Sequence, residues 1–271
     1  MPLNSKPARS SAQRPGYWRT PRSPEPVEAI TGRLVVGLQP VRECLRVRGA
    51  DVSRLALTTG ENPKLAALER FAVAQGTTNI VRLSRGEMDR LAQGAQHQGA
   101  IAIAPALELL TLEQVLARPN LLAIALDRVQ DTQNFGAVIR SAVATGEAAV
   151  VWGEHASAPL TPATFRASAG AIEHAALCRV PALKDALMAA REAGAQVIGL
   201  VAQAEGMLCQ ADLRGPTVIV LGSESTGLQP AVRRCCTHLA AIVRPRVVDS
   251  LNASVAAAIA LYEASKQRNF V

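Results

Sequence analysis

Short apolar runs alternate with longer amphipathic runs in the first third of the chain. The predicted strands are residues 33–37, 55–58, 79–83 and 100–104, and the predicted helices are residues 41–48 and 62–75. In the second of these helices Leu65, Leu68 and Ala72 fall on one face, as in a helix that packs against a core. The alternation predicts a compact α/β unit over residues 30–105.

Side chains mark two further helix starts. Ser84 is followed three residues later by Glu87, and Thr111 is followed three residues later by Gln114. In this capping-box pattern each side chain bonds the backbone N–H of the other residue. The first pair predicts a helix inside the α/β unit. The second predicts a short helix inside a linker at residues 106–120.

A longer alternation of strands and helices follows the linker. The predicted strands are residues 121–126, 148–152, 175–179, 196–202, 217–221 and 239–243, and the predicted helices are residues 134–145, 162–171, 183–193, 230–235 and 253–266. Strands that alternate with helices predict a mostly parallel sheet with helices on both faces. Ligands of such sheets bind beyond the carboxyl ends of the strands.

Composition and charge add a leader to this picture. Residues 1–29 are rich in Pro, Ser and Arg and lack periodicity, which predicts disorder. Residues 1–26 hold five basic side chains against one acidic side chain, in a chain of net charge +7. Such a leader suits a polyanion such as RNA, and it equally suits plain solvation. No apolar run reaches the ~18 residues of a membrane span, and no secretory signal is seen, so we expect a cytoplasmic protein without a membrane.

The first candidate turn follows the strand at residues 121–126. Asn134 and Gly136 open the next helix, and Arg140 comes six residues after Asn134. Taken alone, Asn134 is explained as a helix N-cap, Gly136 as a packing glycine and Arg140 as a solvated surface charge.

The second candidate turn follows the fully apolar strand at residues 217–221. Gly222 would let the backbone approach a ligand closely, and Glu224 could hold a ligand hydroxyl or amine. No Lys-Ser/Thr pair follows Gly227, so this turn is not a phosphate-binding P-loop.

The third candidate turn precedes an Ala-rich helix. Ser250 and Asn252 are good N-cap residues, so capping explains them. Capping does not explain Leu251, a bulky apolar residue between two polar ones.

Together, these turns have the order Asn…Arg, then Gly-x-Glu-x-x-Gly, then Ser-Leu-Asn before a small-residue helix. This order resembles the SpoU–TrmH family of RNA 2′-O-ribose methyltransferases over roughly residues 121–266, most closely its rRNA guanosine members. The first α/β unit resembles the ribosomal-protein-like RNA-binding domain that precedes the catalytic domain in those members, at residues 37–41 and 97–99.

The resemblance implies a fold, a methyl donor and a site. We expect residues 121–271 to form an α/β methyltransferase domain with a trefoil knot, in a homodimer that binds S-adenosylmethionine and RNA, rRNA rather than tRNA, and needs no metal. The matched catalytic positions are Asn134, Arg140, Glu224, Ser250 and Asn252, and the matched donor-binding positions are Gly222, Ile242 and Leu251. Because an arginine normally keeps its proton, Arg140 would hold the target phosphate or stabilise the developing alkoxide.

Departures from the family pattern leave other functions open. Thr132 follows Asp131, Ser225 follows Glu224, and the loop 244–249 before the third motif carries two arginines. These features also fit a non-catalytic RNA-binding relative in ribosome assembly or resistance, or the same chemistry on tRNA. A dinucleotide-dependent oxidoreductase is disfavoured, because no glycine fingerprint follows the first strand of either unit.

Overall fold

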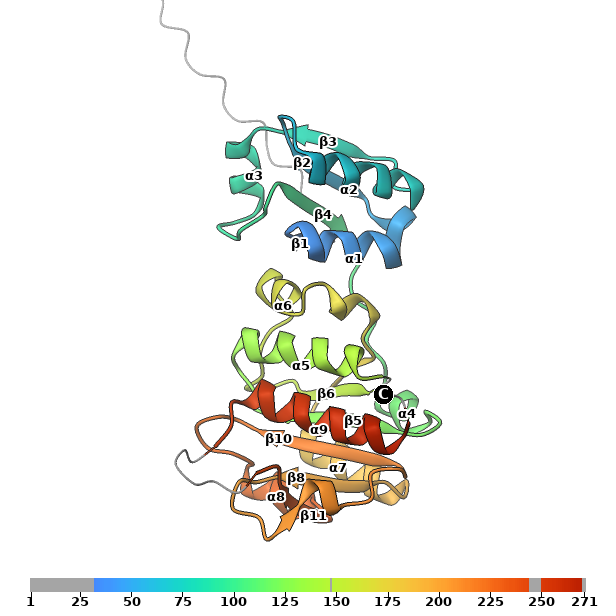
Figure 1. Ribbon diagram of the computed structural model, residues 1–271, viewed down its shortest axis with the longest axis vertical. Coiled ribbons are helices and arrows are strands. Elements are labelled where there is room, and N and C mark those ends of the chain that lie inside the picture. Colours follow the sequence, from blue (N-terminus) through green and yellow to red (C-terminus); the bar gives the residue numbers. More distant parts are fainter. Residues whose placement is uncertain (1–31, 147, 244–249, 270–271) are drawn as a thin grey trace, which may run out of the picture. The chain divides into compact units, whose positions relative to one another are not determined.

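A computed structural model describes residues 32–146, 148–243 and 250–269 (Figure 1). The predicted leader at residues 1–29 and the loop 244–249 lie outside the described residues. Within the described part, no helix is both long and apolar enough to cross a membrane.

The first α/β unit is a four-stranded mixed sheet between helices. Its elements are β1 (Arg33–Val36), α1 (Leu38–Arg48), β2 (Arg54–Thr58), α2 (Pro63–Ala74), β3 (Ile80–Leu83), α3 (Arg85–Leu91) and β4 (Ala100–Ala104). The strand order is β1-β4-β2-β3, in which β4 is antiparallel to both neighbours and β2 is parallel to β3. Alternate β4 residues serve the two faces: Ala102 packs with α1 and α2, while Ile101 packs against Met88 of α3. Strands and helices therefore alternate over residues 33–104, as the pattern predicts.

The second unit contains a seven-stranded sheet. Its strands are β5 (Leu122–Asp127), β6 (Ala149–Gly153), β7 (Leu177–Val180), β8 (Gln196–Leu200), β9 (Gly206–Met207), β10 (Thr217–Gly222) and β11 (His238–Ala241), in the order β7-β6-β5-β10-β8-β11-β9. Every pairing among these strands is parallel, which confirms the predicted sheet type. The two-residue strand β9 was not predicted, since two residues carry no alternation.

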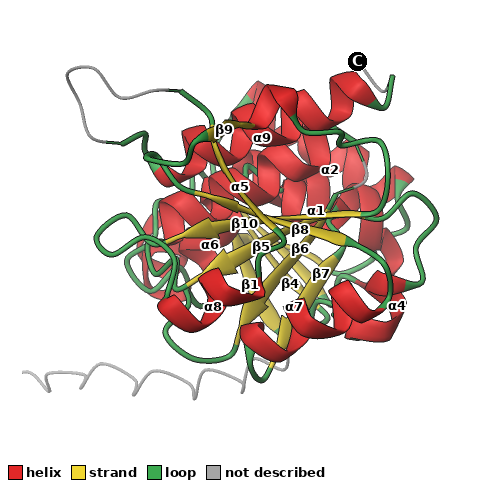
Figure 2. Ribbon diagram, turned by 90° about the horizontal axis from the view of Figure 1, so that it is seen from below, coloured by secondary structure: helices red, strands yellow, loops and turns green. Residues whose placement is uncertain are grey.

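Helices cover both faces of this sheet (Figure 2). The elements are α4 (Leu112–Leu116), α5 (Thr132–Ala144), α6 (Pro162–Ala167), α7 (Leu183–Glu192), α8 (Pro230–Cys235) and α9 (Ala253–Gln267). On β5, Ile124 and Leu126 point into the core beneath α5 and α9, while Ala123 and Ala125 point into the core beneath α4, α7 and α8. A parallel sheet buried on both sides explains why its strands are continuous apolar runs rather than alternating ones.

The strand order places the switch point of the sheet between β5 and β10. From β5 the chain runs outward to β6 and β7, then crosses to β8 and returns to β10 beside β5. Segments that leave the carboxyl ends of two such neighbours diverge and open a crevice, where ligands of open α/β sheets bind. The first two candidate turns both leave the sheet there.

Three details of the predicted helices are wrong. Helix α1 begins at Leu38, with Gly37 as its N-cap, instead of at Val41. Helix α5 begins at Thr132, with Asp131 as its N-cap, instead of at Asn134. The single helix predicted at 162–171 is two pieces, α6 and the 3₁₀ helix η2 (Ala171–His174), because Gly170 between them adopts a left-handed φ of 84°. Both capping boxes form as predicted, at Ser84 and at Thr111.

Candidate active site

The first motif places an amide at the start of α5. The carboxylate of Asp131 accepts hydrogen bonds from the backbone N–H groups of Gln133 (2.6 Å) and Asn134 (2.9 Å) and so caps the helix. Because Asp131 caps α5, the explanation of Asn134 as an N-cap is wrong. The Asn134 side chain is left available for contacts outside its own helix.

The second motif is a tight turn, closed on itself, after β10. The N–H of Gly227 donates to the carbonyl of Ser223 at 2.9 Å, and the hydroxyls of Ser223 and Thr226 share a hydrogen bond of 2.8 Å. Gly227 has a left-handed φ of 63°, and a side chain at Gly222 would collide with the backbone of Gly227 and Leu228. Both glycines are therefore required by the turn that presents Glu224.

The amide–carboxylate cluster, consisting of Asn134, Glu224 and Asn252, joins the three motifs. Oε1 of Glu224 accepts from Nδ2 of Asn134 and, at 2.9 Å, from Nδ2 of Asn252. Nδ2 of Asn252 also donates to Oδ1 of Asn134 at 3.1 Å. Three predicted catalytic residues, from segments far apart in sequence, thus meet at one point.

Asn252 uses the two ends of its amide differently. Its Oδ1 caps α9 by accepting from the N–H groups of Ser254 (2.9 Å) and Val255 (3.3 Å), while its Nδ2 belongs to the cluster. Capping and site formation are therefore combined in one side chain.

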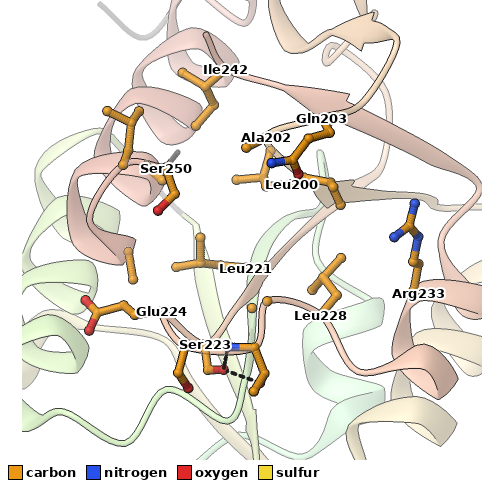
Figure 3. A pocket seen from close by; sticks show the side chains of 18 of the residues that line it. Leu200, Ala202, Gln203, Leu221, Ser223, Glu224, Leu228, Arg233, Ile242 and Ser250 are labelled. Carbon is orange, nitrogen blue, oxygen red and sulfur yellow. Dashed lines mark hydrogen bonds between the residues drawn. The ribbon is translucent and has the colours of Figure 1, made fainter. Parts of the chain in front are cut away.

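A cavity of about 730 Å³ lies next to the cluster, beyond the carboxyl ends of β8, β10 and β11 (Figure 3). The predicted donor-binding residues Gly222, Ile242 and Leu251 all line it, and so do Glu224 and Ser250. Part of the wall is apolar, including Leu200, Leu221 and Leu228, and part is polar, including Gln203, Thr226 and Arg233. Its volume lies in the usual range for small-molecule sites, about 300–1,000 Å³.

The polar groups of this cavity lie apart from one another. Glu224 and Ser250 lie at one end and Arg233 at the other, with Leu200, Leu221 and Leu228 between them (Figure 3). Such a cavity suits a ligand with a flat apolar part and a cationic or hydroxyl-bearing part. Ile242 and Leu251 also pack against the core beneath α5 and α9, which fixes the wall they form.

The structure does not bring the other two predicted catalytic residues into the cluster. Arg140 is exposed on α5, does not line the cavity, and makes no hydrogen bond or ion pair within the described part of the chain. Ser250 is exposed at the edge of the cavity without joining the cluster.

Asp127 is a residue near the cavity that the sequence analysis did not single out. Its side chain ends β5 and is only 3% exposed, and its Oδ2 accepts from the N–H of Gln229 at 2.6 Å. Burial raises the pKa of the Asp127 carboxyl, and the bond from Gln229 and the nearby Arg128 oppose this rise. The signal in the sequence was a single carboxylate at the end of an otherwise apolar run.

Comparison with known proteins identifies the family. Residues 121–262 match the SpoU rRNA Methylase family, and residues 34–110 match the RNA 2′-O ribose methyltransferase substrate-binding domain. The chain belongs to the SpoU rRNA methylase family. This SpoU methylase therefore has both parts expected from the resemblance, and the oxidoreductase alternative is set aside.

Relatives match this SpoU methylase over most of its length. An uncharacterised tRNA/rRNA methyltransferase of Mycolicibacterium smegmatis is 36% identical over 242 residues, covering 87% of this chain and 76% of the relative. The 23S rRNA (guanosine-2′-O-)-methyltransferase RlmB of Shewanella oneidensis is 35% identical over 240 residues, covering 87% and 97%.

A solved structure supports the fold and the donor. The SpoU methyltransferase AviRb of Streptomyces viridochromogenes, in complex with the cofactor AdoMet, is 26% identical with a TM-score of 0.72 over 88% of this chain and 91% of that one. The expectation that S-adenosylmethionine is the methyl donor is confirmed for the family.

Proposed function

We propose that this SpoU methylase transfers the methyl group of S-adenosylmethionine to a ribose 2′-hydroxyl in ribosomal RNA. The observation that carries the proposal is the convergence of three separated motifs on one cluster beside a cavity of suitable size. The match of residues 34–110 to an RNA-substrate domain, together with the rRNA-modifying relative in Shewanella, supports rRNA over tRNA.

In this proposal the chain positions the reactants more than it supplies reactive groups. Bound S-adenosylmethionine supplies an already activated methyl group, so the enzyme must align the ribose oxygen in line with it and help remove one proton. Gly222, Ile242 and Leu251 would hold the donor. The cluster would fix the turn after β10 against the starts of α5 and α9. The guanidinium of Arg140, which has no partner among the described residues, would hold a phosphate or stabilise the developing alkoxide.

The division of labour along the chain is also a proposal. Residues 30–105 would bind RNA, residues 106–120 would link, residues 121–271 would catalyse, and the basic leader 1–29 would add phosphate contacts. We propose that the methyl transfer takes place in the cytoplasm, where the RNA substrate is found. Deleting residues 1–26 is expected to weaken RNA binding and to reduce the dependence of RNA affinity on salt concentration. An unchanged salt dependence would show that the leader does not contact RNA phosphates.

Helix α9 supports the proposed homodimer. Val255, Ile259 and Tyr262 are 46%, 39% and 54% exposed and recur at helical spacing along one face. Residues such as Ala257 and Leu261, on the opposite face, pack with α5 in the core. A second copy would cover the exposed face. Ile259→Glu is expected to shift the protein toward monomer in analytical ultracentrifugation, and an unchanged dimer would exclude this face.

The trefoil knot remains a proposal taken from the family resemblance. The described residues on either side of the loop 244–249, Val243 and Ser250, both line the cavity. A crystal structure that traces this loop would test whether the chain is threaded.

Methyl transfer tests the proposed function directly. Protein, labelled donor and either ribosomal or transfer RNA would be incubated, and 2′-O-methyl nucleotides would then be mapped. Label in ribosomal RNA is the expected result. Label in transfer RNA alone would show that the substrate is transfer RNA and not ribosomal RNA. Calorimetry with S-adenosylmethionine tests the non-catalytic alternative, which predicts no donor binding.

A further inference from the structure

Two consecutive residues at the end of β5 hold the loop that forms one wall of the cavity. This cavity loop, residues 223–229, follows β10, and the last residue pair between β10 and β5 is Gly222 with Asp127. Asp127 and the next residue, Arg128, therefore lie beside the base of the loop. We call these two residues the β5 tether.

Each member of the tether bonds a different part of the cavity loop. Oδ2 of Asp127 accepts from the N–H of Gln229, at the end of the loop, at 2.6 Å. Nη2 of Arg128 donates to Oγ1 of Thr226, in the middle of the loop, at 2.8 Å. Nε of Arg128 lies 3.9 Å from Oδ1 of Asp127, so the two tether side chains also attract each other.

The Arg128 side chain lies partly buried against the protein, with 34% of its surface exposed. Its φ is 58°, in the left-handed region that side chains other than glycine seldom occupy. Its Nε is buried and has no hydrogen-bond partner among the described residues. The buried Nε shows that the base of the guanidinium lies against the protein, from where Nη2 reaches the hydroxyl of Thr226.

The cavity loop is held to other elements at more than one point. The cluster holds it at Glu224, and the β5 tether holds it at Thr226 and Gln229. The bonds of Ser223 to Thr226 and to Gly227 close the turn and fix its shape, but they do not fix its place on the sheet. The same loop supplies a continuous stretch of the cavity wall and carries Glu224. A shift of the turn would therefore move both the donor wall and the carboxylate of the cluster.

We propose that Arg128 is a positioning residue for the methyl-donor site, acting through the hydroxyl of Thr226. The inference rests on the proposed function, since it takes the cavity to be the donor site. Arg128 does not line the cavity, and its effect on the donor is indirect. The contrasting view is that its guanidinium binds an RNA phosphate and its bond to Thr226 is incidental.

A double-mutant cycle separates these views. Donor affinity would be measured by calorimetry with S-adenosylmethionine for Arg128→Ala, Thr226→Val and the double variant. Each single change is expected to weaken donor binding about tenfold, the order of one hydrogen bond to a charged group. The double variant is expected to bind the donor about as tightly as the single variant with the lower affinity, because both changes remove the same bond.

Matched variants control the cycle. Because Thr226 itself lines the cavity, Thr226→Ser, which keeps the hydroxyl, is expected to weaken donor binding less than Thr226→Val does. Arg214→Ala removes an exposed arginine that pairs with Asp212 away from the cavity, and it should leave donor binding unchanged. In steady-state assays Arg128→Ala should raise the KM for the donor and leave kcat at saturating donor within about twofold.

Hydrogen exchange of the ligand-free protein gives a readout that needs no donor. Arg128→Ala and Thr226→Val are each expected to speed exchange at the amides of Gly227 and Gln229, while Thr226→Ser does not. If the wild type binds no donor, the proposed function fails and loop exchange still decides the inference. Additive losses in the cycle, unchanged loop exchange, or a raised KM for RNA with normal donor affinity would each overturn it.

Discussion

Replacing Arg140 by alanine should separate catalysis from folding. Arg140 is exposed on α5, makes no hydrogen bond or ion pair within the described part of the chain, and does not line the cavity. Loss of such a side chain should change the free energy of unfolding by less than about 0.5 kcal/mol. Donor affinity should also stay unchanged. If Arg140 nevertheless holds the reacting phosphate or alkoxide, the rate of methyl transfer should fall by about 10²–10⁴.

The assay is single-turnover methyl transfer with RNA and donor both saturating, beside thermal unfolding and donor calorimetry on the same preparations. Arg140→Lys keeps the charge but loses the planar fork that matches a phosphate, so an intermediate rate is expected. Arg179→Ala, an exposed arginine on the edge strand β7, is the matched control. Full transfer by Arg140→Ala, or a loss of transfer explained by unfolding, would refute the reasoning.

Three further predictions concern the stability of the fold. Gly136→Ala should lower the free energy of unfolding by about 1–3 kcal/mol in denaturant, because the new Cβ would lie 2.5 Å from the Cβ of Ala167. An unchanged free energy of unfolding would show that α6 shifts to make room. Asp127→Asn should be more stable than wild type at pH 7, since burial raises the pKa of this carboxyl and penalises its ionised form; the advantage should shrink as pH falls through that raised pKa, and a pH-independent difference in Tm would contradict it. Glu173→Ala should cost about 3–5 kcal/mol, measured by urea unfolding, because it leaves the buried guanidinium of Arg33 without the carboxylate 2.5 Å away; a change below 1 kcal/mol would show that Arg33 finds water instead.

Hydrophobic patterning was sufficient to predict the layers of the fold. Buried parallel strands are apolar along their whole length, and their alternation with helices leaves few arrangements. Helix starts were less certain, because Asp131 and Asn134 are both good caps only three residues apart. Asp131 caps α5, and the Asn134 amide instead bonds Glu224, a residue far away in sequence.

The candidate site was predictable where it depends on the ends of neighbouring strands. Gly222 and Glu224 follow a central strand, and the topology brings them to the same edge as Asn134. The places of Ile242 and Leu251 in the wall came only from the family resemblance. The role of Arg128 could not have been predicted, since the residue has a left-handed φ that the sequence does not indicate.

The double use of Asn252 has a consequence for laboratory evolution. An aspartate caps a helix about as well as an asparagine, so a screen for stability alone would accept either residue at this position. An aspartate, however, has no N–H to offer Glu224 and would set a second carboxylate beside it. Stability-guided libraries of this enzyme would therefore retain inactive proteins at position 252 unless transfer is selected at the same time.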